Sequence, residues 1–507
     1  MPSNIHEKIN KAFEYIESWF ENIEKIKENE IKDFAQYIYT KVCFVFVTLA
    51  ENMDLNRFFV RMNNRGKQLE KHEILKARIL HKIDKSERDQ YAKIWDLCSD
   101  MDKYIFQSND SETYQVKSII DFPTFLLHCY KLFTKDDISI TKDKLLDIMW
   151  EKDTLLKVKS ENCITFIESM LRYRVLFDSF VIKFTAKADK DINDKESSYK
   201  IKRLGSDGNL VNSNLNDLEM IQNYLRVARS GTNQNYEHWL TDFLEFLDDD
   251  NSQFDEIKEI KNFLSNKDKN KLPESLVKKE SQKDEPLTKL QEKLVEHLEK
   301  VDTKQICKVN IKDKELEDIS REFLKEYLSN GTNTPHYWFY RLEYYLWKWG
   351  KDKPEKLGSF CKKLDDYSFD LKAKNCVLNS NYFHFRMLGS IEHFSAVQRQ
   401  DKREKKWNLD IFGNLALISQ NFNSSLSNEL ENCKKDKVIE QLKRGRLESL
   451  KYFIMCANLN QVEWTEGDAQ EHQNQMIAIL IKSLRFTKFK QTKGWRAVKF
   501  HSQNTKI

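Results

Sequence analysis

Apolar residues near the N-terminus recur every three or four positions, which is the pattern of an amphipathic helix. The stripe consists of Ile5, Ile9, Phe13, Ile16, Phe20, Ile23 and Ile26. Apolar spacing around residues 122–133, 166–184 and 216–247 predicts further long helices. The block HYWFYRLEYYLWKW at residues 336–349 has aromatic rings too dense for a single stripe, and it predicts a buried helix. The pattern as a whole predicts a mostly α-helical protein.

Three stretches interrupt the helical pattern. Residues 42–49 are an apolar run that predicts a buried strand or a helix segment in the core, and the run is too short to span a membrane. Residues 186–215 are polar and predict a loop or insertion. Residues 251–319, rich in Lys, Glu, Asp, Asn and Gln, predict a polar linker or a solvated helix. We therefore expect a helical region over residues 1–250, then this linker, a C-terminal domain over residues 320–470 and a tail over residues 471–507.

Composition supports this organisation. A chain of 507 residues is long enough for two or three domains. Its 12 glycines and 6 prolines are too few for a fold with many tight turns, which argues against a strand-rich sandwich or barrel. The 9 scattered cysteines predict reduced, mostly buried thiols. Because the N-terminus is charged and amphipathic, without the pattern of a signal peptide, we expect a soluble cytoplasmic protein with no membrane partner.

The last residues of the chain are basic and aromatic. Lys488, Lys490, Lys493, Trp495 and Arg496 combine positive charge with a ring that could stack on a base. Such a segment predicts contact with nucleic acid through phosphates and bases. The alternative is a terminal helix or strand whose aromatic residues pack while its lysines stay solvated.

Residues 390–430 carry the best candidate chemistry. Glu392 and His393 are followed by a charged loop, a short apolar strand at residues 415–418, and asparagines at the expected start of a helix. A neutral imidazole can activate water near neutral pH, and carboxylate and amide oxygens are ligands that Mg²⁺ prefers. Neighbouring residues of a regular strand point to opposite faces, so Glu392 and His393 converge only at a strand end or bulge. The alternative is a surface Glu-His pair beside an Asn-rich turn.

This segment resembles the HNH nuclease module of GmrSD-type restriction endonucleases. The family motif runs E-H-I-x-P-Q, then G-N-L-x-L-L, then N-x-x-L-S-N, and all three blocks occur here in order. The resemblance implies a small ββα-metal nuclease module near the C-terminus that uses Mg²⁺ or Mn²⁺. It also implies that His393 is the general base, Glu392 a metal ligand, Asn414 the residue that orients the base and Asn423 the second metal ligand. Asn421 is the alternative for that last role.

Two features concern the completeness of this match. Ala396 stands where the family has proline, which predicts a looser loop after His393. A second match, F-x-x-x-N-x-R-G-x-x-L at residues 59–69, resembles the late part of the family's ParB-like module, although an ordinary strand-to-helix connection explains it equally well. The early D-G-Q-Q-R-type motif of that module is missing. The resemblance therefore implies a companion subunit that supplies the missing N-terminal half, in a hetero-oligomer.

The resulting hypothesis is a metal-dependent DNA endonuclease subunit of a bacterial anti-phage or modification-dependent restriction system. The main alternative is a non-catalytic DNA-binding or assembly subunit whose HNH site has drifted. An RNase with the same metal site is a third possibility, because such a site acts on the phosphate and not on the sugar. Zinc is disfavoured, since His384 and His393 have no cysteine pair at ligand spacing.

Overall fold

The structure is a computed structural model that divides the chain into two compact units, Met1–Leu69 and Glu70–Ile507. It describes residues 11, 14, 15, 18, 28–42, 70–105, 114–151, 154–187, 198–204, 210–228, 237–250, 285–309, 321–352, 383–396, 406–427, 429–459 and 463–485. In the first unit it describes helix α2 (Glu28–Lys41). The apolar run at residues 43–49 and the motif at residues 59–69 lie outside the described residues.

The second unit begins with a group of helices around one apolar core. Helix α4 opens with a capping box in which Glu70 and Glu73 exchange side-chain and backbone hydrogen bonds. Helix α6 opens at Asp121, whose carboxylate accepts the backbone N–H of Thr124 at 3.0 Å. Helix α8 runs through the middle of the group and contacts α4, α5, α6 and α7. The elements are α4 (Lys71–Lys82), α5 (Lys85–Ser99), α6 (Phe122–Thr134), η1 (Lys142–Lys144), η2 (Asp147–Glu151), α7 (Leu155–Val158) and α8 (Ser160–Phe180).

Two small antiparallel sheets follow the long helix. The first has the order β1-β2-β3, with Val116 opposite Thr185. Its strands are β1 (Tyr114–Ser118), β2 (Lys183–Lys187) and β3 (Ser198–Lys200), and the second sheet pairs β4 (Lys202–Leu204) with β5 (Leu210–Asn212). The prediction of a loop over residues 186–215 is therefore wrong where these strands lie. The helix expected over residues 166–184 ends at Phe180 and gives way to β2.

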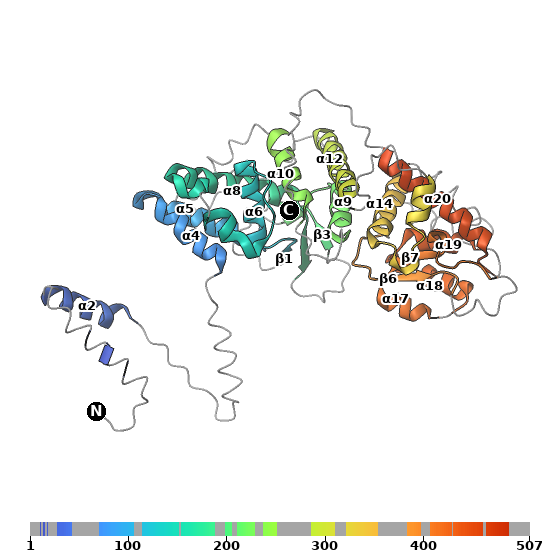
Figure 1. Ribbon diagram of the computed structural model, residues 1–507, viewed down its shortest axis with the longest axis horizontal. Helices are drawn as coiled ribbons and strands as arrows, with labels where there is room; N and C mark the ends of the chain where they lie inside the picture. The colour runs from blue at the N-terminus through green and yellow to red at the C-terminus, as the bar shows by residue number, and fades with distance from the viewer. Residues whose placement is uncertain are drawn as a thin grey trace, which may run out of the picture. The chain divides into compact units, whose positions relative to one another are not determined.

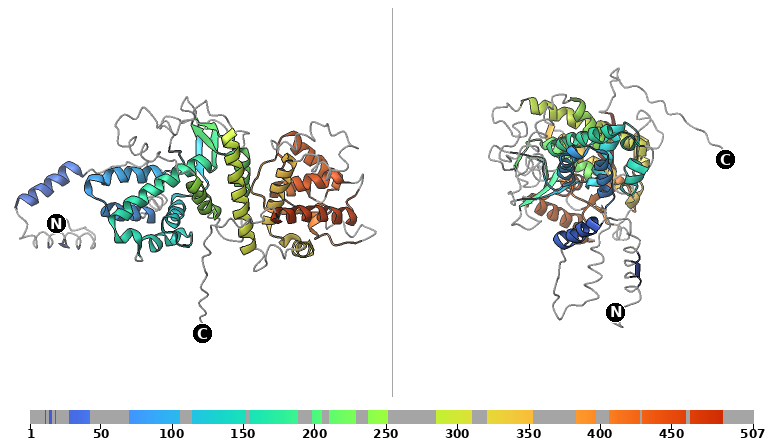
Figure 2. Two further views of the ribbon diagram at one scale, coloured as in Figure 1. Left: turned by 90° about the horizontal axis from the view of Figure 1, so that it is seen from above. Right: turned by 90° about the vertical axis from the view of Figure 1, so that its left-hand side faces the viewer.

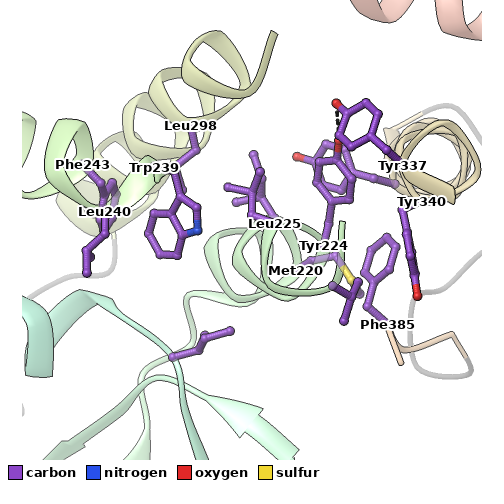
Figure 3. Packing of buried hydrophobic residues seen from close by; sticks show 14 of the residues in the cluster. Met220, Tyr224, Leu225, Trp239, Leu240, Phe243, Leu298, Tyr337, Tyr340 and Phe385 are labelled. Carbon is purple, nitrogen blue, oxygen red and sulfur yellow. Dashed lines mark hydrogen bonds between the residues drawn. The ribbon is translucent and has the colours of Figure 1, made fainter. Parts of the chain in front are cut away.

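Helices α9 (Asn216–Val227), α10 (Trp239–Asp250) and α12 (Glu285–Val309) form the next layer. Helix α12 contacts both α9 and α10, and it lies beside them in Figures 1 and 2. Figure 3 shows Leu298 of α12 near Trp239 and Leu240 of α10. Residues 285–309 are thus helical, as one of the two alternatives predicted, but one face of this helix is buried rather than solvated.

The last part of the unit contains the aromatic block and the two strands β6 and β7. The aromatic block forms α14, which confirms the predicted buried helix: Trp338, Leu342 and Leu346 are inaccessible to solvent. Strand β7 contacts α14 and α19, and β6 contacts α17 (Figure 1). The elements are α13 (Arg321–Tyr327), η5 (Gly331–Asn333), α14 (His336–Asp352), β6 (Ser390–His393), η7 (Phe412–Asn414), β7 (Leu415–Ile418), α17 (Gln420–Leu426), α18 (Glu431–Lys443), α19 (Leu450–Asn458) and α20 (Glu466–Arg485).

Helix α20 changes the picture of the predicted tail. It continues to Arg485, and Met476, Ile477 and Leu480 are fully buried against the core. It contacts α13, α14 and η7. Residues 471–485 of the predicted tail therefore belong to the packed helical part of the chain. The rest of the predicted tail, residues 486–507, lies outside the described residues.

A buried polar network joins four helices of this unit. Arg341 on α14 donates to Asp302 on α12 at 2.5 Å and to the hydroxyl of Ser483 on α20 at 2.9 Å. The Tyr224 hydroxyl on α9 donates to Asp302 at 2.9 Å, and the rings of Tyr224 and Tyr337 lie together in Figure 3. Because every member is hydrogen-bonded, the network links these helices without leaving a buried charge unpaired.

The cysteines and the helix lengths bear on two expectations from the sequence. The described cysteines are free, and Cys98, Cys129, Cys163 and Cys456 are buried, whereas Cys433 is exposed. None of the described helices is both long enough and apolar enough to cross a membrane.

Candidate functional site

Strands β6 and β7 and helix α17 form a compact ββα unit. The strands pair antiparallel, with Glu392 opposite Ala416 and His393 opposite Leu415. All four residues of β7 are buried, as expected for a short apolar strand inside a core. Helix α17 then begins at Ser419, whose hydroxyl accepts the backbone N–H of Phe422 at 3.1 Å. The predicted order of strand, loop, strand and helix is confirmed.

His393 is the last residue of β6. Its Nε2 atom lies 2.8 Å from Oδ1 of Asp410, which belongs to the segment before η7. The His393 side chain is 16% exposed, so the ring is largely buried yet reachable. Nδ1 of the ring forms no hydrogen bond with the described residues. One ring nitrogen is therefore held by a carboxylate, and the other is not hydrogen-bonded within the described residues.

Glu392 lies on the other face of the strand end, where it is buried. Its Oε1 atom accepts a hydrogen bond from Nζ of Lys434, on α18, at 2.6 Å. Burial raises the pKa of Glu392, and the neighbouring ammonium of Lys434 opposes that rise. Lys434 also donates to the carbonyls of His393 at 2.9 Å and Phe394 at 3.0 Å. A single buried lysine thus fixes both the carboxylate and the backbone that carries the histidine.

Asn414 is fully buried and bonds only to backbone. Its Oδ1 accepts the N–H of Ser395 at 2.9 Å, and its Nδ2 donates to the carbonyls of Ser395 at 3.2 Å and Leu409 at 2.9 Å. Its own carbonyl accepts the N–H of Phe394 at 2.8 Å. The side chain does not bond the imidazole of His393. Any influence of Asn414 on the histidine therefore passes through the backbone of the loop that it holds.

Asn423 lies on α17 and faces β6. Its Nδ2 donates to Oγ of Ser390 at 2.6 Å. Ser390 and Glu392 are two residues apart on one strand, so their side chains share a face, and Asn423 is directed to the face that carries Glu392. Asn421, the alternative ligand, is exposed. Of the two asparagines, Asn423 is the one that contacts the strand.

The loop after His393 is held despite the missing proline. Ser395 is fixed through its backbone by Asn414, and its hydroxyl donates to Glu431 at 2.8 Å. The ring of Phe394 packs edge-on against Tyr452 and Trp464, with centroid distances of 5.3 and 5.1 Å. Residues 394 and 395 are thus held by contacts that do not involve residue 396.

Further buried groups support the unit from the side of α19. Lys451 donates to the carbonyl of Phe412 at 2.8 Å and also to that of Leu415. Burial lowers the pKa of Lys451 to about 7. Glu343 on α14 accepts the first backbone N–H groups of α19, including that of Leu450 at 2.6 Å, and burial raises its pKa to about 7. These groups position β7, and their hydrogen bonds within the described residues do not involve His393.

Sequence reasoning missed Asp410, Lys434 and Gly331, three residues that contact the site or its immediate neighbours. Gly331 in η5 has a positive φ of 56°, and a Cβ built there would lie 2.8 Å from Cγ of Asp410. The family motif does not include these positions: Asp410 lies in the loop between two of its blocks, and Lys434 and Gly331 lie outside residues 390–430. An aspartate in a loop and a lysine on a helix are common features without the fold to combine them.

A carboxylate and an amide oxygen near β6 are of the kind that a hard divalent cation prefers. The described residues contain no group of three or more His, Cys, Asp or Glu side chains that could hold a metal ion. Among the described residues, Oε2 of Glu392 and Oδ1 of Asn423 accept no hydrogen bond; Glu392 shares its face of β6 with Ser390, the residue to which Asn423 is bonded. Mg²⁺ binds through one or two carboxylates and retains several waters, so a carboxylate and an amide oxygen suit it. Asn63–Gly66 and the predicted nucleic-acid ligands Lys488, Lys490, Lys493, Trp495 and Arg496 lie outside the described residues.

His393 at the end of β6, and the oxygen donors of Glu392 and Asn423 on the other face of the strand, are groups of the kinds that phosphodiester hydrolysis uses. Residues 317–479 match the family model of the GmrSD restriction endonuclease C-terminal domain, and residues 2–80 match that of the N-terminal domain. These two parts of the chain are therefore similar to the two domains of the GmrSD restriction endonuclease family. The C-terminal match includes the whole ββα unit. No curated protein and no solved structure matches the chain.

Proposed function

We propose that this chain is a metal-dependent HNH-type DNA endonuclease subunit in which His393 is the general base. One observation carries the proposal: His393 ends β6 with one ring nitrogen held by Asp410, inside a segment that matches a restriction endonuclease domain. A base in this position takes a proton from water that attacks a phosphodiester, and a neutral imidazole is suited to that step near neutral pH.

Glu392 and Asn423 are the residues that would hold a divalent cation, Mg²⁺ or Mn²⁺. When bound, such a cation stabilises negative charge on the phosphate and on the leaving oxygen. Lys434 keeps Glu392 in place through its other carboxylate oxygen, and Ser390 keeps the amide of Asn423 turned toward the strand. Asn414 fixes the backbone on both sides of the loop and so limits the movement of His393.

The biological role and partners extend this proposal. A nuclease of this family would act on invading or modified DNA in a bacterial restriction system. A companion subunit would supply the early part of the N-terminal ParB-like module. The basic residues from Lys488 to Arg496 would add phosphate contacts, which predicts an affinity for DNA that falls as salt rises.

One observation favours a second candidate, a non-catalytic DNA-binding or assembly subunit. Glu392 is already paired with the buried ammonium of Lys434, so a cation would have to bind beside an internal positive charge. A site that had lost its metal could be maintained in this way by the ion pair alone. Binding of Mn²⁺ separates the two candidates.

The test is cleavage of supercoiled plasmid with Mg²⁺, with Mn²⁺ and with a chelator, both alone and with the companion subunit. The wild type is compared with His393→Ala and with His384→Ala, a matched control at an exposed histidine. Cutting that needs metal and disappears only in His393→Ala supports the proposal. Cutting that survives His393→Ala refutes the role of His393, and cutting of RNA but not of DNA refutes the substrate.

Binding of Mn²⁺ is measured separately by electron paramagnetic resonance, because binding does not depend on activity. The wild type should bind Mn²⁺, and Glu392→Gln and Asn423→Ala should bind it about 10-fold or more weakly, since each loses one of two protein ligands. Asn421→Ala is the matched control and should bind as the wild type does. No binding by the wild type, together with no cleavage, supports the non-catalytic candidate.

A further inference from the structure

Asp410 is placed to control which nitrogen of His393 carries the proton. Its Oδ1 lies 2.8 Å from Nε2. An ionised carboxylate has no hydrogen to donate, so it acts only as an acceptor. A neutral imidazole has one N–H and one lone pair. The contact therefore favours the tautomer with hydrogen on Nε2 and leaves the lone pair on Nδ1.

We propose that Asp410 is a positioning residue that fixes the ring and the tautomer of His393, so that Nδ1 is the atom that accepts the proton from water. This inference rests on the proposed role of His393 as a base. After His393 takes the proton, the imidazolium has its positive charge next to the Asp410 carboxylate. The same contact thus holds the ring in one orientation before and after the proton transfer.

The backbone on both sides of Asp410 and the backbone directly after His393 are hydrogen-bonded to the same residue, Asn414. Asn414 donates through Nδ2 to the carbonyl of Leu409 at 2.9 Å and through its own N–H to the carbonyl of Ile411 at 2.9 Å. These two residues flank Asp410. The carbonyl of Asn414 accepts the N–H of Phe394, directly after His393, at 2.8 Å. Both partners of the contact are therefore positioned relative to one buried asparagine.

A second segment confines the carboxylate of Asp410 from outside this loop. Gly331 is buried, has a φ of +56°, and leaves room for Asp410 only because it has no side chain. A Cβ at this position would be 2.8 Å from Cγ, 3.0 Å from Oδ1 and 3.1 Å from Cβ of Asp410. The Asp410 side chain is 57% exposed, so Gly331 is a close contact on a group that is otherwise largely open to solvent.

The direct test is ¹⁵N NMR of the full chain labelled at histidine, because the shifts of the two ring nitrogens identify the tautomer. The His393 resonances are assigned by their loss in His393→Ala. The wild type should show the Nε2–H tautomer, and Asp410→Ala should show a mixture or the other form. Asp410→Asn keeps an oxygen acceptor but gains an N–H donor that can bond Nε2, so it should show less of the Nε2–H form than the wild type.

Cleavage under single-turnover conditions supplies the second readout. Asp410→Ala should lower the rate by about 10- to 100-fold, as loss of such a partner does at comparable sites, with DNA affinity unchanged. The cleavage rate of Asp410→Asn should lie between those of the wild type and Asp410→Ala. Gly331→Ala should displace Asp410 and lower the rate as well, whereas Gly389→Ala, where an added Cβ meets nothing within 4 Å, is the matched control and should not.

The outcomes separate this inference from the proposed function. A tautomer unchanged by Asp410→Ala overturns the inference, and so does undiminished cleavage by that variant. If the wild type does not cut nucleic acid but Asp410→Ala changes the tautomer, the positioning contact is supported and the proposed nuclease function fails.

Discussion

The Lys434→Met substitution tests whether the end of β6 is held by one buried ammonium group. Lys434 is inaccessible to solvent and donates to Oε1 of Glu392 at 2.6 Å and to the carbonyls of His393 and Phe394 at 2.9 and 3.0 Å. Methionine has a similar length and keeps the apolar packing of the stem. It removes the charge and all three hydrogen bonds, so the change is confined to polar interactions.

The magnitude follows from what the substitution leaves behind. Removing one partner of a buried ion pair costs about 3–5 kcal/mol, because the other charge stays buried without compensation. The two carbonyls each lose a hydrogen bond worth about 1 kcal/mol. Protonation of Glu392 limits the total, since burial already raises the pKa of this carboxyl group. We expect Lys434→Met to lower the free energy of unfolding by about 3–5 kcal/mol.

The assay is urea unfolding followed by tryptophan fluorescence, with a double-mutant cycle. The variant that combines Glu392→Met with Lys434→Met should be destabilised by less than the sum of the single changes, by roughly 2 kcal/mol or more. Lys443→Met is the matched control, because Lys443 is exposed on the same helix and its loss should change stability by under about 0.5 kcal/mol. A cost below about 1 kcal/mol for Lys434→Met, or strict additivity in the cycle, would refute the reasoning.

Three further predictions concern single residues. Asn414→Ala leaves the N–H of Ser395 and the carbonyl of Leu409 without their partner, so it should lower the free energy of unfolding by about 2–3 kcal/mol. It should also raise hydrogen exchange at residues 394–396, and unchanged exchange there would contradict the prediction. Ser427 has a φ of +47° and a ψ of −139°, a conformation favoured only by glycine, so Ser427→Gly should raise the urea midpoint by an amount equivalent to about 1 kcal/mol. Burial lowers the pKa of His472 well below its usual range, so the unfolded chain takes up a proton near pH 6.5 that the native protein does not. Stability should therefore fall as the pH drops below about 6.5, by up to about 1.4 kcal/mol per unit, and His472→Phe should flatten that slope in urea titrations at pH 7 and pH 5.5.

The parts of the fold that sequence could predict are those specified by local pattern. The aromatic density of residues 336–349 allows only a buried helix, and α14 is one. The four apolar residues 415–418 are bounded by Gly413 and by Ser419, a good helix N-cap, and they form β7. In each case the neighbouring residues alone favour the structure that forms.

The small sheets could not be predicted in the same way. Strand β2 reads KFTAK and directly follows a long helix, so helical spacing extends into it. It becomes a strand because Tyr114–Ser118, far earlier in the chain, pairs with it along its whole length. Strands of three to five residues are too short for alternation to be recognised, and their pairing depends on tertiary contacts that no local window contains.

The candidate site shows the same division between local motif and distant contact. Glu392, His393, Asn414 and Asn423 belong to one motif, so sequence could propose all four, although their roles remain predictions. The partners that hold them come from elsewhere: Lys434 from α18, Asp410 from the loop before η7 and Gly331 from η5. The motif thus specifies which groups could react, whereas their orientation depends on residues that only the fold brings together.

Asn414 illustrates how this distinction alters a mechanistic expectation. The family resemblance implies that it orients the histidine, which suggests a hydrogen bond to the imidazole. Every recorded hydrogen bond of its side chain goes instead to backbone, at Ser395 and Leu409, and the ring is bonded by Asp410. Loss of Asn414 should therefore loosen the loop that carries both members of the His393–Asp410 contact, while loss of Asp410 should release the ring and leave the loop intact. Because only the first change should raise hydrogen exchange in the loop, this measurement separates the two roles.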